Sequence, residues 1–241
     1  MSSLYLPNML VAGGVSQEGV GLLVDESGRV SGYLNPGQVR QATRIVPLVG
    51  RAILPGLANA HSHTFQRLFR GRAERRAAGG DTFWTWREQM YRAAAFCSPE
   101  DLFYVARATF LEMVSSGITV VGEFHYLHND PGGNAYDDPN LLSKQVIRAA
   151  QSVGLRICLL RTAYFRAGFK QVPNPGQRRF YERPDAYLRN LESLLANFAG
   201  EENVRVGAAP HSIRAVPLLD LKAISAFAQA RESFPLHLHI S

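Results

Sequence analysis

Two histidines one residue apart, His61 and His63, lie at the end of an apolar stretch that begins at Ile53. Side chains at positions i and i+2 of a β-strand point to the same side, so both imidazoles are expected to face one point. Two neutral imidazoles on one side are half of a typical zinc or iron site. The bare His-x-His pattern is weak evidence, because two polar residues at a strand end produce it as well. Further residues of the chain are needed to distinguish a pair of metal ligands from two polar residues at a strand end.

Histidines also lie near the ends of other apolar stretches. These stretches are typical of buried strands, and we predict five of them, over 53–63, 118–126, 155–165, 204–213 and 234–241. Besides His61 and His63, the histidines concerned are His125, His211 and His239. Functional groups of parallel α/β folds gather at the carboxyl ends of the strands. The pattern therefore predicts one site that draws on several strands.

Helical patterns separate the predicted strands. We predict helices over 82–95, 98–116, 138–154, 184–198 and 217–232. The second is the clearest, because Ser98 is a good N-cap, Pro99 suits the first turn and Gly117 ends it. Strands that are apolar on both faces and alternate with helices indicate a parallel sheet covered by helices.

We therefore expect the α/β class and an incomplete (β/α)8 TIM-type barrel over residues 53–241, with about five βα units of the usual eight. A barrel is favoured over a doubly wound sheet, because a single site would draw on each strand. Residues 1–52 differ, with short Val and Leu runs broken by glycine-rich turns. They predict part of a small β-sandwich domain ahead of the barrel.

The sequence LPGLANAHSH at 54–63 resembles the signature of the amidohydrolase superfamily, in which a short β-domain precedes a metal-binding barrel. In that family a further metal histidine belongs to the fifth strand, where this chain has His239. The resemblance implies one Zn²⁺ per site, bound by His61, His63 and His239. His237 occupies the neighbouring i−2 position, where a core or supporting role is expected.

Four motifs make the resemblance more specific, and they occur in the same order and with similar spacing in the formimidoylglutamate deiminase family. They are HSHTFQR at 61–67, FWTWRE at 83–88, EFHY at 123–126 and HSIRAV at 211–216. That family converts N-formimino-L-glutamate to N-formyl-L-glutamate and ammonia in bacterial histidine degradation. The resemblance implies a pocket for a small acidic substrate formed by Gln66, Arg87, Tyr126, His211 and Arg214, with His211 also counted as catalytic.

The chemistry of arginine supports this assignment independently. Formiminoglutamate carries two carboxylates, and a planar guanidinium binds a carboxylate through two parallel hydrogen bonds. Arg87 and Arg214 are therefore candidate carboxylate clamps, although a surface arginine on a helix is an even alternative for Arg87. His125 and His128 are as well explained by structural roles as by functional ones.

The family's acid/base glutamate lies three positions after the fifth-strand histidine, beyond Ser241, as do a sixth-strand histidine and an eighth-strand aspartate. We therefore expect this chain alone to be truncated, inactive and weak in zinc binding. Two alternatives stay open. One is a deaminase of the same superfamily acting on a guanine- or triazine-like ring, and the other is a non-catalytic remnant.

Composition agrees with a globular enzyme, since 46% of the 241 residues are hydrophobic and 19% are charged. Cys97 and Cys158 form no CxxC pair, and the N-terminus has no secretory pattern, so we expect a cytoplasmic protein without a membrane segment. An arginine cluster accompanies a net charge of +6, and we interpret it as a solvated face, with no nucleic-acid partner. A homodimer is expected for the full-length protein. The clustered arginines are Arg67, Arg70, Arg72, Arg75 and Arg76.

Overall fold

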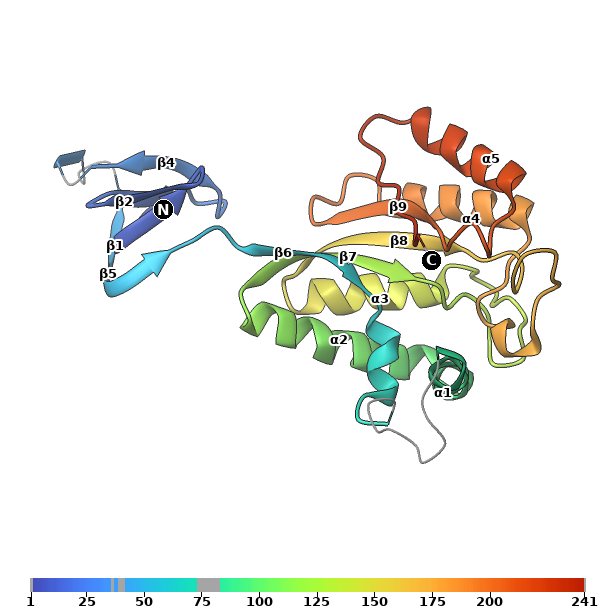
Figure 1. Cartoon of the computed structure of the whole chain (residues 1–241). Coiled ribbons are helices and arrows are strands. Elements are labelled where there is room, and N and C mark those ends of the chain that lie inside the picture. Colours follow the sequence, from blue (N-terminus) through green and yellow to red (C-terminus); the bar gives the residue numbers. More distant parts are fainter. Residues whose placement is uncertain (1, 36, 39–41, 73–82, 241) are drawn as a thin grey trace. The chain divides into compact units, whose positions relative to one another are not determined.

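The computed structural model describes residues 2–35, 37–38, 42–72 and 83–240 (Figure 1). Contacts divide the chain into two compact units, Met1–Gly56 and Leu57–Ser241. Among the helices of the described ranges, none is both long and apolar enough to span a membrane.

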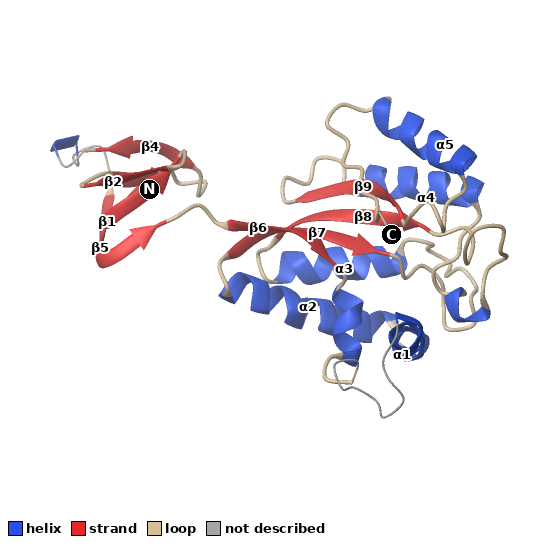
Figure 2. Cartoon of the chain, viewed as in Figure 1, coloured by secondary structure: helices blue, strands red, loops and turns tan. Residues whose placement is uncertain are grey.

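The first unit contains one five-stranded sheet (Figure 2). Its central strand is β1, which pairs antiparallel with β2 and β3 and parallel with β5. Gly13 and Gly14 form the tight turn between β1 and β2 with positive φ angles of 58° and 80°, which glycine adopts without strain. The strands are β1 (Ser3–Ala12), β2 (Val15–Glu18), β3 (Gly21–Val24), β4 (Val30–Leu34) and β5 (Arg44–Ile53).

The second unit contains a parallel sheet with the strand order β6-β7-β8-β9 (Figure 2). Neighbouring strands in the sheet are also consecutive in the sequence, with helices between them, as the alternating pattern predicts. The strands are β6 (Leu57–Ser62), β7 (Ile118–His125), β8 (Arg156–Ala163) and β9 (Val204–Pro210). The α/β class with a parallel sheet is confirmed, and closure into a barrel stays a prediction.

Helices connect these strands and pack beside them (Figure 1). The core between helices and sheet is apolar, with Phe110, Val146, Leu159 and Leu191 completely buried. The helices are α1 (Phe83–Phe96), α2 (Pro99–Ser115), α3 (Leu141–Ser152), α4 (Pro184–Asn197) and α5 (Leu218–Gln229). Two short 3-10 helices, η2 (Thr64–Phe69) and η3 (Pro175–Gln177), follow β6 and β8.

The predicted start and end of α2 are confirmed. The Ser98 side chain accepts a hydrogen bond from the Asp101 backbone, and the Asp101 carboxylate accepts one from the Ser98 backbone. This capping box satisfies two N–H groups that a helix start otherwise leaves unpaired. At the other end, Gly117 has a φ of 84° and stops the helix.

The predicted helix start at Asp138 is wrong by three residues, since α3 begins at Leu141. The Asp138 carboxylate accepts a hydrogen bond from the Asn140 backbone and pairs with Lys144, so it forms a turn ahead of the helix. The predicted fifth strand at 234–241 is present only as two isolated parallel bridges, Ala208 with Leu236 and Ser212 with His239. These bridges place the segment beside β9.

Candidate metal centre and substrate pocket

Three histidines from two distant segments converge at the carboxyl end of β6. The Nε2 atom of His61 lies 3.0 Å from Nε2 of His63 and 3.1 Å from Nε2 of His239. In a tetrahedral zinc site with bonds of 2.0–2.1 Å, two ligand nitrogens are about 3.4 Å apart. The three imidazoles are thus arranged as one face of a metal site.

Hydrogen bonding prepares His63 to act as a ligand. Its Nδ1 lies 2.8 Å from the Phe124 carbonyl oxygen, which can only accept, so Nδ1 carries the proton. The Nε2 lone pair then faces His61 and His239. The Phe124 ring also stacks on His239, with centroids 4.1 Å apart and planes 15° apart. Phe124 thus orients two of the three imidazoles, a role that its position in the sequence does not reveal.

The pKa values of this cluster favour the neutral imidazole that a metal requires. Burial lowers the pKa of His63 and of His239 to about 4, and the hydrogen bond to Phe124 opposes this only partly for His63. Burial also lowers the pKa of His61. All three rings are therefore uncharged near neutral pH and offer a lone pair.

A buried carboxylate fixes the loop that follows His63. Glu123 on β7 is completely buried, and its Oε1 accepts hydrogen bonds from the Thr64 backbone at 2.7 Å and the Thr64 hydroxyl at 2.8 Å. Burial raises the pKa of Glu123, and the bonds from Thr64 oppose this. Beside it, a Cβ added to Gly122 would lie 2.6 Å from the Ala60 carbonyl oxygen, so β6 and β7 approach closely here. These contacts hold the His-x-His segment against β7.

A cavity of about 120 Å³ adjoins two of the three histidines, His63 and His239. The structure brings all five predicted substrate residues to this cavity, from four separate segments of the chain. They are Gln66, Arg87, Tyr126, His211 and Arg214. Sequence reasoning missed Trp86, Met90 and Tyr164, which line the same cavity. Of these, Trp86 belongs to a quoted motif, which could have indicated its place.

On one side of the cavity, Gln66 and Tyr126 form a pair. The Gln66 amide nitrogen donates to the Tyr126 hydroxyl at 2.7 Å, and that hydroxyl lies 3.3 Å from the Met90 sulfur. Burial raises the pKa of Tyr126, so the phenol stays protonated. His211 lies beside it, with ring centroids 5.7 Å apart. Burial lowers the pKa of His211 well below its usual value, and His239 adds to this, so the His211 ring is neutral.

The two arginines of the cavity are held by neighbouring groups. Arg87 on α1 lies over the Tyr91 ring, with its guanidinium carbon 5.4 Å from the centroid. Arg214 follows β9, and its backbone carbonyl accepts a hydrogen bond from the Arg166 side chain at 2.8 Å. A second bond from Arg166 to the Ile213 carbonyl, at 2.9 Å, holds the same turn. The cavity thus combines two positive side chains with neutral donors and acceptors.

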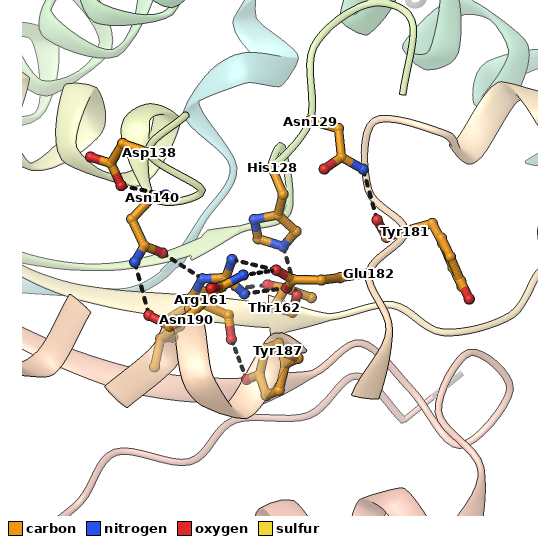
Figure 3. A network of polar contacts seen from close by, with 11 residues as sticks. His128, Asn129, Asp138, Asn140, Arg161, Thr162, Tyr181, Glu182, Tyr187 and Asn190 are labelled. Atoms are coloured by element: carbon orange, nitrogen blue, oxygen red, sulfur yellow. Dashed lines mark hydrogen bonds and ion pairs between the residues drawn. The ribbon is translucent and has the colours of Figure 1, made fainter. Parts of the chain in front are cut away.

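The remaining histidines of the strand ends lie elsewhere. His125 and His128 are almost completely buried, and His128 Nε2 lies 2.8 Å from the Thr162 carbonyl oxygen (Figure 3). They interact with Arg161, and neither belongs to the group of His61, His63 and His239. This position agrees with a structural role for both.

The arginine cluster lies partly within the described residues. Arg67 and Arg70 both pair with Glu112 on α2, and Arg72 lines a separate surface hollow. Arg75 and Arg76 lie outside the described residues. The ion pairs to Glu112 reduce the positive charge that this face offers to a phosphate backbone.

Comparisons with known proteins extend these observations. The sequence model of the amidohydrolase family matches residues 52–241. Over 194 residues the chain is 41% identical to formimidoylglutamate deiminase from Pseudomonas aeruginosa, a match that covers 80% of this chain and 42% of that protein.

Solved structures agree with this result. The crystal structure of an amidohydrolase from Brucella melitensis superposes with a TM-score of 0.87 and 31% identity, over 98% of this chain and 51% of that one. Atrazine chlorohydrolase from Arthrobacter aurescens TC1, in complex with zinc, superposes with a TM-score of 0.82 over 99% of this chain and 53% of that one. Its identity of 21% shows the fold alone. The chain thus spans about half of the length of these relatives.

Proposed function

Because this chain belongs to the amidohydrolase family, we propose that the whole protein is a zinc-dependent deaminase of N-formimino-L-glutamate. The reaction releases ammonia and N-formyl-L-glutamate, a step of histidine degradation. The chain spans 42% of the related deaminase, so the proposal concerns the protein encoded by the complete gene. A cytoplasmic location and a homodimer remain predictions for that protein.

The proposal depends on one observation. Arg87 and Arg214 line the same cavity as His63 and His239. The proposed substrate has two carboxylates and an amidine carbon to be attacked. Guanidinium groups bind carboxylates through paired hydrogen bonds, while a neutral ring has no group that requires two such clamps. The charges of the pocket therefore favour an acidic substrate whose amidine end faces the histidines.

The residues of the metal cluster fit one zinc ion. His61, His63 and His239 would hold it, because their Nε2 atoms converge and the protonated Nδ1 of His63 leaves its Nε2 free. When bound, zinc lowers the pKa of a water molecule toward neutrality and so supplies a nucleophile for the amidine carbon.

The neutral groups of the cavity orient the amidine. His211 is uncharged, and because its Nδ1 lies 3.3 Å from Ser212 Oγ, its Nε2 is left to donate or to accept one hydrogen bond, which suits a group with polar N–H and imine nitrogen atoms. The Tyr126 hydroxyl accepts from Gln66 and donates to the Met90 sulfur, a weak acceptor that a polar substrate atom can replace. Burial of these groups excludes water and strengthens each hydrogen bond to the substrate.

The test measures ammonia release from N-formimino-L-glutamate by the zinc-loaded protein expressed from its complete gene. We expect turnover, and Arg87→Ala or Arg214→Ala should each raise KM about 10- to 100-fold, because a hydrogen bond to a charged group contributes about 1.5–3 kcal/mol. Arg189→Ala is the matched control, since Arg189 pairs with Asp185 on the exposed side of α4, away from the cavity.

The same experiment can overturn the proposal. A protein that deaminates a guanine- or triazine-like ring, with activity unchanged in Arg87→Ala and Arg214→Ala, belongs to the alternative class of ring deaminases. A zinc-loaded protein without turnover of any of these substrates indicates a non-catalytic protein. Residues 1–241 by themselves are assayed in parallel, with no turnover expected.

A further inference from the structure

Tyr164 lies directly after β8 and lines the cavity, although no part of the function proposed above uses it. Its side chain is only 4% exposed, and its ring centroid lies 4.6 Å from that of His211. The phenol is thus in the wall of the cavity, beside a residue already assigned to the substrate.

The hydrogen bonds around Gln177 determine whether the Tyr164 hydroxyl acts as a donor or as an acceptor. The Asn174 backbone N–H donates to Gln177 Oε1 at 3.1 Å, which orients the amide and leaves its nitrogen toward Tyr164. Gln177 Nε2 lies 2.7 Å from the Tyr164 hydroxyl oxygen. An amide nitrogen only donates, so the Tyr164 oxygen is the acceptor, and its single proton can go to the neighbouring Tyr91 hydroxyl or to a ligand in the cavity.

Positive charge acts on the same hydroxyl. Burial raises the pKa of Tyr164, and the nearby Tyr91 adds to this, whereas Arg214 and Arg87 lower it. Both arginines also line the same cavity as this phenol, and the phenol remains a donor at neutral pH. A donor beside two guanidinium groups is suited to a carboxylate.

The loop that carries Gln177 is held by a buried polar network (Figure 3). Arg161 on β8 is completely buried and makes two hydrogen bonds to the Glu182 carboxylate, at 2.5 Å and 3.0 Å. The Glu182 carboxylate also accepts a hydrogen bond from Asn190 on α4, and the Glu182 backbone N–H donates to the Tyr164 carbonyl at 3.3 Å. The network therefore fixes the start and the end of the loop between β8 and α4.

The arrangement resembles the pair of Gln66 and Tyr126 in the same cavity. Gln66 donates to the Tyr126 hydroxyl at 2.7 Å, the same distance as between Gln177 and Tyr164. Both tyrosines line the cavity, and each has an amide that satisfies its oxygen as an acceptor. The two pairs thus share an amide donor to a phenol oxygen, and they differ in that the Tyr126 hydroxyl also donates to the Met90 sulfur.

We propose that Tyr164 is a specificity-determining residue that donates its phenol hydrogen to the substrate carboxylate bound by Arg214 or Arg87. Gln177 is its positioning residue. This inference rests on the proposed acidic substrate, and it adds a neutral donor to the two arginines.

The experiment compares Tyr164→Phe with Tyr187→Phe in the zinc-loaded protein expressed from its complete gene. Tyr187 is a matched control, because it is also buried and its hydroxyl donates to the Arg161 carbonyl at 2.7 Å, outside the cavity. We expect Tyr164→Phe to raise KM for N-formimino-L-glutamate about tenfold, as for a lost hydrogen bond to a charged group, with kcat nearly unchanged. Tyr187→Phe should leave KM unchanged.

Two further measurements separate positioning from folding. Gln177→Met should raise KM less than Tyr164→Phe, because the phenol is kept and only its direction is lost. Competitive inhibition by glutarate, a plain dicarboxylate, should weaken in Tyr164→Phe by the same factor as KM rises. Zinc content and thermal unfolding of each variant show that the fold and the metal are retained.

The possible failures are distinguishable. A wild-type protein that turns over the substrate, with the same KM and glutarate inhibition in Tyr164→Phe, overturns the role of Tyr164 and leaves the proposed function standing. A fall in kcat without a change in KM overturns it as well, since the phenol then acts on the reacting group. A wild-type protein that neither turns over the substrate nor binds glutarate overturns both proposals.

Discussion

Two groups of histidines occupy the carboxyl ends of neighbouring parallel strands, and their surroundings differ. His61 and His63 at the end of β6 meet His239, with Nε2 atoms 3.0 Å and 3.1 Å apart. His125 and His128 at the end of β7 are buried, and their ring centroids lie 6.0 Å apart. The first group converges on one point, and the second lies within a network of buried polar side chains.

The difference shows that position at a strand end does not decide the role of a histidine. Adjacent residues of a strand point to opposite sides. On β7, the Phe124 ring stacks on the metal cluster, whereas His125 and His128 interact with Arg161. On β7, Phe124 therefore faces the cluster of His61, His63 and His239, whereas the next residue, His125, faces the buried polar side chains.

The largest expected effect concerns the metal cluster. His63→Ala removes one of the three predicted imidazole ligands. Loss of a group that only supports a ligand lowers metal affinity by up to about 100-fold, so we expect the loss of a ligand itself to lower zinc affinity by more than that. Titration with a chelating dye measures the affinity in the full-length protein. His128→Ala is the control and should retain zinc. Equal zinc affinity in His63→Ala and wild type would show that the cluster is not the metal site.

The sequence was sufficient to predict that these three histidines lie together, because the pattern has a physical basis. His61 and His63 are two residues apart at the end of β6, and the resemblance supplied His239. Their role as metal ligands stays a prediction. The sequence could not reveal Tyr164 or Phe124, because their roles depend on contacts with Gln177 and His63 that bring together distant segments.

Helix starts were predictable where the capping residue has no competing partner. Ser98 caps α2 as its sequence indicates. A helix start was also predicted at Asp138, but its carboxylate accepts a hydrogen bond from the Asn140 backbone and pairs with Lys144, so α3 starts later. The β8–α4 loop had no signal in the sequence, because the Arg161–Glu182 pair that holds it joins residues 21 positions apart.

The second prediction concerns the polar network that surrounds His128. Glu182→Ala leaves the buried guanidinium of Arg161 without its carboxylate, and we expect the free energy of unfolding to fall by about 3–5 kcal/mol. Urea unfolding measures this loss. Asp185→Ala breaks exposed pairs with Arg183 and Arg189 and should cost less than about 1 kcal/mol. A similar loss in both variants would contradict the distinction between buried and exposed pairs.

The smallest effect is expected for His125→Phe. No side chain of the described residues hydrogen-bonds to a ring nitrogen of His125. An apolar ring of similar shape loses the contact with the Leu127 backbone, and since a hydrogen bond contributes about 1 kcal/mol, stability at pH 7 should change by no more than that. His128→Ala should cost more, because it removes the contact with the Thr162 carbonyl. A large loss in His125→Phe would show that His125 has a polar partner that matters.

The pH dependence of stability tests the same residue more sharply. Burial lowers the pKa of His125 well below 6.5, and the charges of His128, Arg161 and Arg179 add to this. Below pH 6.5 the unfolded chain takes up a proton that the folded chain does not, so stability falls with decreasing pH until the lowered pKa is reached. His125→Phe removes one such proton, which should flatten the slope by up to about 1.4 kcal/mol per pH unit. Urea unfolding between pH 7 and pH 5 measures both slopes, and parallel curves would mean that the pKa of His125 is the same in the folded and the unfolded chain.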